Sequence, residues 1–215
     1  MEKQLIKLIS ILTGKKGRYN RLILEVLAEN PNGLKAWDIA KEIWKRLKVE
    51  EDWYRGAQRI YSLLIRKGGR LEELESKEYI VSKENKWQLT EKGLITVLVM
   101  KPEFKSKYKE EIGAMVDKFL KEFNKIKAVA KDNRLLIELL DMYISIVKTG
   151  LEDLDFVIDE IVKNTRKLIM SGVNLDLIPS NNVFLLILTY GEFFEDIKKI
   201  FSKKLCDNFS GDRSL

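Results

Sequence analysis

The spacing of apolar residues changes twice along this 215-residue chain, and these changes constrain the fold more than any other feature. From residue 18 to residue 67, apolar side chains recur every three or four positions, as on amphipathic helices. From Tyr79 to Thr90 they alternate with polar ones, as in short half-buried strands. Beyond Thr90 the longer spacing returns. The sequence therefore predicts a mainly α-helical protein with one small β-hairpin.

Three helices are expected before the hairpin. They cover about residues 18–29, 34–49 and 52–67. Asp52 is expected to cap the third helix, and Gly68-Gly69 to break or kink it, since glycine disfavours helix interiors. A short amphipathic piece follows. The apolar side of the third helix is expected to face inward, and it comprises Trp53, Ala57, Ile60, Tyr61, Leu64 and Ile65.

The hairpin is expected to pair "YIVSK" with "KWQLT", two short runs separated by Glu84-Asn85. Asn tolerates the left-handed backbone of a tight two-residue turn. Thr90 is then expected to cap a helix that ends ahead of Pro102. Lys83 and Lys86 flank the tip of this hairpin.

The remaining chain reads as helices only, over about 103–130, 132–149, 152–171 and 182–205. Apolar spacing in the first of these is close to 3.6 residues, which favours a packed bundle over an extended coiled coil. We expect three parts: an N-terminal amphipathic helix at 1–17, a domain at 18–100, and an all-α bundle at 101–215. The bundle is expected to mediate dimerisation or to bind an effector or partner.

Positive charge is concentrated in the first half of the chain. Residues 1–100 hold 20 Lys and Arg against 14 Asp and Glu, a net charge of +6. Residues 101–215 hold 19 of each, so their net charge is zero. A basic module joined to a neutral one indicates that the first part meets a polyanion.

The third helix carries much of this positive charge on its polar side. Between Tyr54 and Arg70 the sequence contains four Arg, one Lys and no acid. At helical spacing, Arg55, Gln58, Arg59, Ser62 and Arg66 share one face. Surface helices usually mix acids and bases, so this face is expected to contact a ligand.

Three helices followed by a hairpin resemble the winged helix-turn-helix superfamily of bacterial and archaeal transcriptional regulators. The likeness rests on "LKAWDIAKEIWKRL", "DWYRGAQRIYSLLIRK" and "LEELESKEYIVSKENKWQLTEKG", and covers about residues 18–100. The resemblance implies a DNA-binding domain in which the third helix reads the major groove and the hairpin, or wing, contacts phosphate or the minor groove. The expected DNA-binding residues are Lys35, Arg55, Gln58, Arg59, Ser62, Arg66, Lys67, Arg70, Lys83 and Lys86.

One departure from the family pattern leaves two registers open. The hairpin normally follows the recognition helix directly, but about a dozen residues lie between Lys67 and Tyr79 here. Either the domain contains an extra short helix, or recognition passes to the segment beginning near Arg66. We favour the first, which alone uses Arg55, Gln58 and Arg59.

The principal function expected is that of a cytoplasmic transcriptional regulator that binds double-stranded DNA as a homodimer, without a cofactor. The alternative is a winged-helix protein–protein interaction subunit of a replication, transcription or chromosome-maintenance complex. The abundance of Lys, Glu and Ile, with no His, is typical of thermophilic and archaeal proteins. Apolar runs are too short to cross a membrane. Aromatic residues of the last helix could line an effector pocket or simply form core.

Catalytic and metal sites are not expected. The chain has no His to activate Cys206, its one thiol. The acids Glu152, Asp153, Asp155, Asp159 and Glu160 form a cluster, but acids in the first turns of a helix are favoured by its dipole. Neither "KKGR" nor "RKGGR" has the spacing of a phosphate-binding loop. These patterns indicate a protein that is not an enzyme.

Overall fold

The computed structural model describes residues 9–47, 52–129 and 153–181, together with positions 134, 137, 138, 140, 141, 144, 145 and 148. Two compact units make up the chain. The N-terminal unit comprises residues 1–104 and 165–184, and the second unit comprises residues 105–164 and 185–215. The predicted division at residue 100 assigned all later residues to one bundle, whereas 165–184 group with the N-terminal unit.

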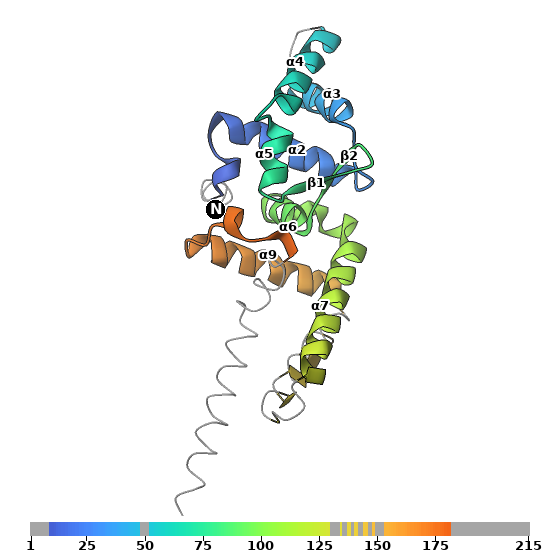
Figure 1. Cartoon of the computed structure of the whole chain (residues 1–215), viewed down its shortest axis with the longest axis vertical. Coiled ribbons are helices and arrows are strands. Elements are labelled where there is room, and N and C mark those ends of the chain that lie inside the picture. Colours follow the sequence, from blue (N-terminus) through green and yellow to red (C-terminus); the bar gives the residue numbers. More distant parts are fainter. Residues whose placement is uncertain are drawn as a thin grey trace, which may run out of the picture. The chain divides into compact units, whose positions relative to one another are not determined.

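The described part is mainly helical with one small antiparallel hairpin, as the spacing of apolar residues predicted (Figure 1). The elements of the N-terminal unit begin with a 3-10 turn. They are η1 (Ser10–Leu12), α2 (Gly14–Glu29), α3 (Ala36–Leu47), α4 (Trp53–Ile65), α5 (Arg70–Ser76), β1 (Ile80–Lys83), β2 (Lys86–Leu89), α6 (Glu91–Met100), the first half of the 3-10 helix η2 (Pro102–Lys107), whose second half belongs to the other unit, and, after α9, the 3-10 turn η3 (Leu175–Leu177).

The first residues differ from the prediction of a separate N-terminal helix over 1–17. Residues 9–13 form only the 3-10 turn η1, and α2 already begins at Gly14. The Asn20 side chain donates to the carbonyl of Ile11 at 2.8 Å, and Arg21 donates to the carbonyl of Leu12 at 2.7 Å. These bonds hold η1 against α2. Residues 1–8 lie outside the described part.

The core of the N-terminal unit is built from the inward sides of α2 to α6. Each helix contributes side chains that are almost fully buried, and such burial is the main favourable term in folding. α6 is buried on every side from Lys92 to Met100, so it is the central helix of this unit. The principal core residues are Ile23, Leu24, Leu27, Ile39, Ile43, Leu64, Leu71, Leu74 and Leu98.

The hairpin has the predicted register and turn. β1 and β2 are antiparallel, with Ile80 opposite Leu89 and Lys83 opposite Lys86. Glu84 and Asn85 both have positive φ, 50° and 61°, as a type I′ turn requires. The hydroxyl of Thr90 caps α6 by accepting a 3.2 Å bond from the amide of Gly93. The capping prediction is therefore confirmed.

A third segment joins the hairpin, and the sequence pattern did not predict it. Leu34 pairs with Trp87 as an isolated antiparallel bridge, with backbone N–H···O distances of 3.1 and 2.8 Å. The turn before it packs closely on β2, since a Cβ at Gly33 would lie 2.6 Å from Cγ of Gln88. The backbone between α2 and α3 therefore acts as a one-residue third strand.

The second unit contains α7 (Lys109–Val129) and the first part of α9 (Leu154–Met170), whose last residues group with the N-terminal unit. Tyr108, Ile112, Val116 and Phe119 are buried along α7, but Ile126 is half exposed. The apolar side predicted for this helix is thus buried in the first part of α7 and exposed near its end. Among the described residues, no helix combines the length and apolar character needed to cross a membrane. The predicted helix at 182–205 lies outside the described part.

Candidate nucleic-acid interface

Helix α4 is held by α3 on one side and capped at its beginning. The carboxylate of Asp52 accepts hydrogen bonds from the amides of Tyr54 and Arg55 at 3.0 and 3.1 Å, which confirms the predicted cap. Gly56 lies against the indole of Trp44 on α3, and a Cβ at that position would overlap the ring. α3 and α4 consequently pack side by side with their backbones close together (Figure 1).

The opposite side of α4 is exposed and carries three arginines, one amide and one hydroxyl. Arg55, Gln58, Arg59, Ser62 and the C-cap residue Arg66 are all exposed, and their spacing of three and four residues puts them on one face. α4 itself contains no Asp or Glu. The Ser62 hydroxyl donates to the carbonyl of Gln58 at 2.9 Å, so its proton is used within the helix. We refer to these five residues as the α4 face.

Two of the expected residues beyond α4 differ sharply from one another. Lys67 is exposed, directly after the helix. Arg70 is only 3% exposed and is ion-paired with Glu73, whose carboxylate also lies 3.5 Å from the amide of Asn20. The expectation that Arg70 contacts DNA is therefore wrong, because its side chain, on the first residue of α5, is buried. The position of Arg70 in the sequence does not indicate that its side chain is buried.

The structure bears on the choice between the two registers. An extra short helix, α5, lies between α4 and the hairpin, as the favoured register requires. The side chains that α5 exposes are Glu72, Glu75 and Ser76. The Glu72 carboxylate accepts a 2.7 Å bond from the amide of Gly68. An acidic face is repelled by phosphates, so α4 suits a polyanion better than α5 does.

Three exposed lysines lie next to one another at the end of the hairpin. Lys83 is directly opposite Lys86 in the last strand pair. Lys35 directly follows Leu34, and Lys86 directly precedes its bridge partner Trp87, so the antiparallel bridge brings the backbone of Lys35 near that of Lys86. Like charges at opposed positions destabilise a sheet. The opposed pair Lys83 and Lys86 is therefore expected to cost stability unless an anion neutralises it, and the acid nearest to this pair in sequence is Glu84 of the turn. We refer to Lys35, Lys83 and Lys86 as the lysine row.

Buried polar contacts fix the base of the hairpin. The carboxylate of Asp176 accepts hydrogen bonds from Nζ of Lys77 and the hydroxyl of Tyr79, both at 2.7 Å, and from the hydroxyl of Ser10. Burial alone raises the pKa of Asp176, but these donors outweigh it and hold the pKa below the ordinary value. Burial, then the charge and hydrogen bond of Asp176, raise the pKa of Tyr79 far above its usual range.

A buried lysine completes this network. Nζ of Lys92 on α6 donates to the carbonyl of Lys77 at 2.6 Å and lies 5.1 Å from the centre of the Tyr79 ring. Burial has the largest effect on the pKa of Lys92 and lowers it below the ordinary value of lysine. Lys92 thereby joins α6 to the turn between α5 and β1, and Asp176 joins the segment after α9 to the same turn. These contacts join residues that lie far apart in the chain, so no single stretch of sequence indicates them.

Trp53 and Ile65 of α4 were predicted to face inward, but both are exposed, as is Tyr54, for which no such prediction was made. Trp53 is 52% exposed and Tyr54 is 53% exposed. Ile65, at the other end, is also half exposed. The expectation of an inward Trp53 and Ile65 is therefore wrong, since the buried residues of α4 are Gly56, Ala57, Ile60 and Leu64.

The acidic cluster of the second unit is neutralised by lysines rather than arranged as a metal site. Nζ of Lys109 lies 2.5 Å from Asp155, that of Lys105 lies 3.1 Å from Asp159, and that of Lys163 lies 3.0 Å from Glu160. Asp153 accepts a 3.1 Å bond from the amide of Phe156 as a helix cap. In the part of the chain that the structure describes, no three His, Cys, Asp or Glu side chains converge as metal ligands. Glu152 and Cys206 lie outside that part.

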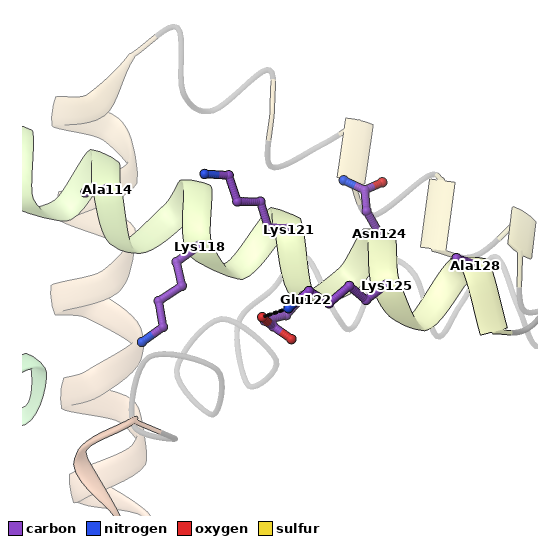
Figure 2. Close-up of a pocket in the computed structure, with 7 residues that line it drawn as sticks. All are labelled: Ala114, Lys118, Lys121, Glu122, Asn124, Lys125 and Ala128. Atoms are coloured by element: carbon purple, nitrogen blue, oxygen red, sulfur yellow. Dashed lines mark hydrogen bonds and ion pairs between the residues drawn. The ribbon is translucent and has the colours of Figure 1, made fainter.

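A hollow of about 580 Å³ lies along α7 (Figure 2). All of the described residues that line it come from this one helix: Ala114, Lys118, Lys121, Glu122, Asn124, Lys125 and Ala128. Lys125 is paired with Glu122 at 2.7 Å, and Lys121 and Asn124 point to the opposite side of the ribbon from Lys118 in Figure 2. The described side chains therefore do not converge as in a small-molecule site. The aromatic residues expected for an effector pocket, such as Phe193, lie outside the described residues.

Comparison of the chain with protein-family models, with curated proteins and with solved structures finds no match.

Proposed function

We propose that this chain is a cytoplasmic DNA-binding protein, a transcriptional regulator whose N-terminal unit is a winged helix-turn-helix domain. In this proposal the α4 face enters the major groove, while the lysine row contacts phosphates or the minor groove beside it. The observation that carries the proposal is the exposed α4 face itself, with three Arg, one Gln and no acid on the helix.

The order of elements supports the winged-helix part of the proposal. Helix α2, the Leu34 strand, helices α3 to α5 and the β1–β2 hairpin follow one another, and Leu34 pairs with β2 of the hairpin. A short third strand gives the wing a base against the helices. The extra helix α5 is the feature that departs from the common pattern.

The chemistry of the α4 face suits a duplex. Arg reads guanine through two hydrogen bonds in the major groove, and Gln reads adenine in the same way. Arg66 and Lys67 at the end of the helix, with the lysine row, suit phosphate contacts that fix the orientation on the duplex. Cations on phosphates release counterions, which makes affinity fall steeply with salt.

We further propose that the protein acts as a homodimer assembled through the second unit. Two copies would then bind half-sites about one helical turn apart. The exposed end of α7, where Ile126 and Val129 are uncovered, is one surface available for such assembly. Light scattering of the full chain at micromolar concentration tests this part, since a monomer contradicts it.

A specific observation favours one rival function. Exposed aromatic rings such as Trp53 and Tyr54 are enriched in protein–protein interfaces. A winged-helix subunit that joins a replication, transcription or chromosome-maintenance complex would use them in this way. Such a subunit needs no affinity for nucleic acid.

Fluorescence anisotropy of the full chain with labelled random-sequence duplex separates the two functions. We expect binding whose affinity falls steeply between low and physiological salt. A preferred duplex sequence is first selected. Arg55→Ala and Arg59→Ala should each weaken binding to that sequence by roughly 1–3 kcal/mol. The same changes should weaken binding to random-sequence duplex by less. An equal loss on every sequence would make these residues backbone anchors. Absence of salt-dependent binding would contradict the proposal and favour the protein-interaction subunit.

A further inference from the structure

Four aromatic residues, three on α4 and one on the neighbouring α3, form a connected cluster. The ring centroid of Trp37 lies 5.8 Å from that of Tyr54 and 5.5 Å from that of Tyr61. Trp53 continues the cluster, 5.7 Å from Tyr54. All three pairs meet edge to face, an arrangement that fixes the rings relative to one another. We call Trp37, Trp53, Tyr54 and Tyr61 the aromatic cluster.

The aromatic cluster is open to solvent in a way that a core cluster is not. About half of Trp53 and of Tyr54 is exposed. Among the described residues eight large apolar side chains are exposed, and three of them, including Ile65, lie on the 13 residues of α4. Exposure of large apolar side chains to water is unfavourable, so three of them on one short helix indicate a binding surface.

The aromatic cluster borders the α4 face directly. Gln58 lies four residues after Tyr54 and three before Tyr61, so helical spacing places its amide between the two tyrosines. Arg55 follows Tyr54 in the chain and lies on the far side of Gln58. The surface of α4 therefore passes from aromatic rings through an amide to guanidinium groups. Asp52, beside Trp53, is occupied by its hydrogen bonds to two backbone amides.

This combination matches one class of ligand better than others. Exposed rings bordered by cations bind single-stranded nucleic acid, because bases stack on the rings while cations contact the backbone. An amide between the rings can bond the edge of a stacked base. A protein partner would also accept the rings and the arginines, since Trp, Tyr and Arg are enriched in protein interfaces. The net charge of +6 over residues 1–100 and the absence of acids on α4 favour a polyanion instead.

We infer that the aromatic cluster stacks on unpaired bases next to a duplex held by the α4 face. The preferred ligand is then a duplex with a single-stranded extension, rather than a fully paired site. This inference rests on the proposed function, since it assigns a more specific nucleic-acid class to the same surface.

Two labelled probes test it with the full chain: a blunt random-sequence duplex and the same duplex carrying an oligothymidine overhang. We expect the overhang probe to bind about tenfold more tightly at equal salt, which corresponds to one or two stacked bases. Addition of the overhang should also quench tryptophan fluorescence. Equal affinity for the two probes overturns the inference while leaving duplex binding intact, whereas no salt-dependent binding of either probe contradicts the proposed function itself.

Paired variants show whether the rings are responsible. Trp53→Ala with Tyr54→Ala should lose most of the preference for the overhang, whereas Trp53→Phe with Tyr54→Phe keeps the rings and should retain it. Phe156→Ala removes a similarly exposed ring from α9 and should change neither affinity. If the Ala pair keeps the full preference, the inference is wrong. It is equally wrong if the Ala pair alters only the oligomeric state in light scattering, because the cluster then serves a second copy of the chain.

Discussion

The hydroxyl of Tyr79 donates a 2.7 Å hydrogen bond to the carboxylate of Asp176, a residue 97 positions later in the chain. The same carboxylate accepts from Lys77 and Ser10, so distant parts of the sequence meet at one buried anion. Tyr79 directly precedes β1, and Asp176 belongs to η3. The position of the hairpin base therefore depends on a segment that follows α9.

Replacing Asp176 should show how much this contact contributes to stability. We expect Asp176→Asn to lower the free energy of unfolding by about 1–3 kcal/mol, since it removes the charge paired with Lys77 and leaves buried donors poorly satisfied. Urea denaturation followed by circular dichroism measures the change. Asp117→Asn, at an exposed position on α7, is the matched control and should change stability by less than about 0.5 kcal/mol.

The same contact predicts a dependence on pH. The pKa of Asp176 is lower in the folded protein than its ordinary value of 3.8, so the folded state favours the ionised carboxylate. The stabilisation is complete above the unfolded pKa and is lost as pH falls from there through the folded pKa. We expect the stability difference between wild type and Asp176→Asn to shrink from about pH 6 to about pH 3. A difference that stays constant or grows over this range would contradict the assignment.

The close packing of α3 on α4 predicts opposite effects for the same substitution at two helical glycines. Gly56→Ala should destabilise the protein by about 1–3 kcal/mol, because the added methyl overlaps the Trp44 indole. Gly113→Ala on α7 should stabilise by up to about 1 kcal/mol, because its Cβ would lie an ordinary 3.7 Å from Leu154 and alanine favours helix. Thermal unfolding of the two variants compares them. A stabilised Gly56→Ala protein would show that the helices do not approach so closely.

The lysine row should contribute to the salt dependence of binding rather than to sequence preference. We expect the triple change of Lys35, Lys83 and Lys86 to Gln to reduce the slope of log affinity against log salt by about 1 for each phosphate that is no longer neutralised. Removing like charges that face one another should also leave the protein as stable or slightly more so. The control is the triple change of Lys118, Lys121 and Lys125 to Gln on α7, which alters net charge equally. Equal salt slopes for the two triple variants would contradict a role for the lysine row in binding phosphates.

Local chemistry made several elements of the fold predictable. Glu84-Asn85 lies between two alternating runs, and its turn and register follow from that pattern alone. Asp52 and Thr90 are caps because their short side chains reach amides two or three residues ahead. The change in apolar spacing likewise placed the hairpin among the helices.

Contacts between distant residues were not predictable in this way. Arg70 reads as a surface cation, yet it is buried against Glu73, since nothing in its local sequence shows what packs over α5. Trp53 fits an apolar stripe, but the stripe extends beyond the buried part of α4. The pairing of Leu34 with Trp87 places Lys35 beside the hairpin, and a single residue carries no periodicity that could signal it.

The most direct test of the proposed interface is an anisotropy titration of random-sequence duplex at low salt with two triple variants. One changes Arg55, Arg59 and Arg66 to Ala on the α4 face, and the other changes Lys118, Lys121 and Lys125 to Ala on α7. We expect the first to weaken binding at least about tenfold and to flatten its salt dependence, with the second close to wild type. Equal affinities for wild type and the arginine variant, both being folded by circular dichroism, would contradict a role for α4 in binding DNA.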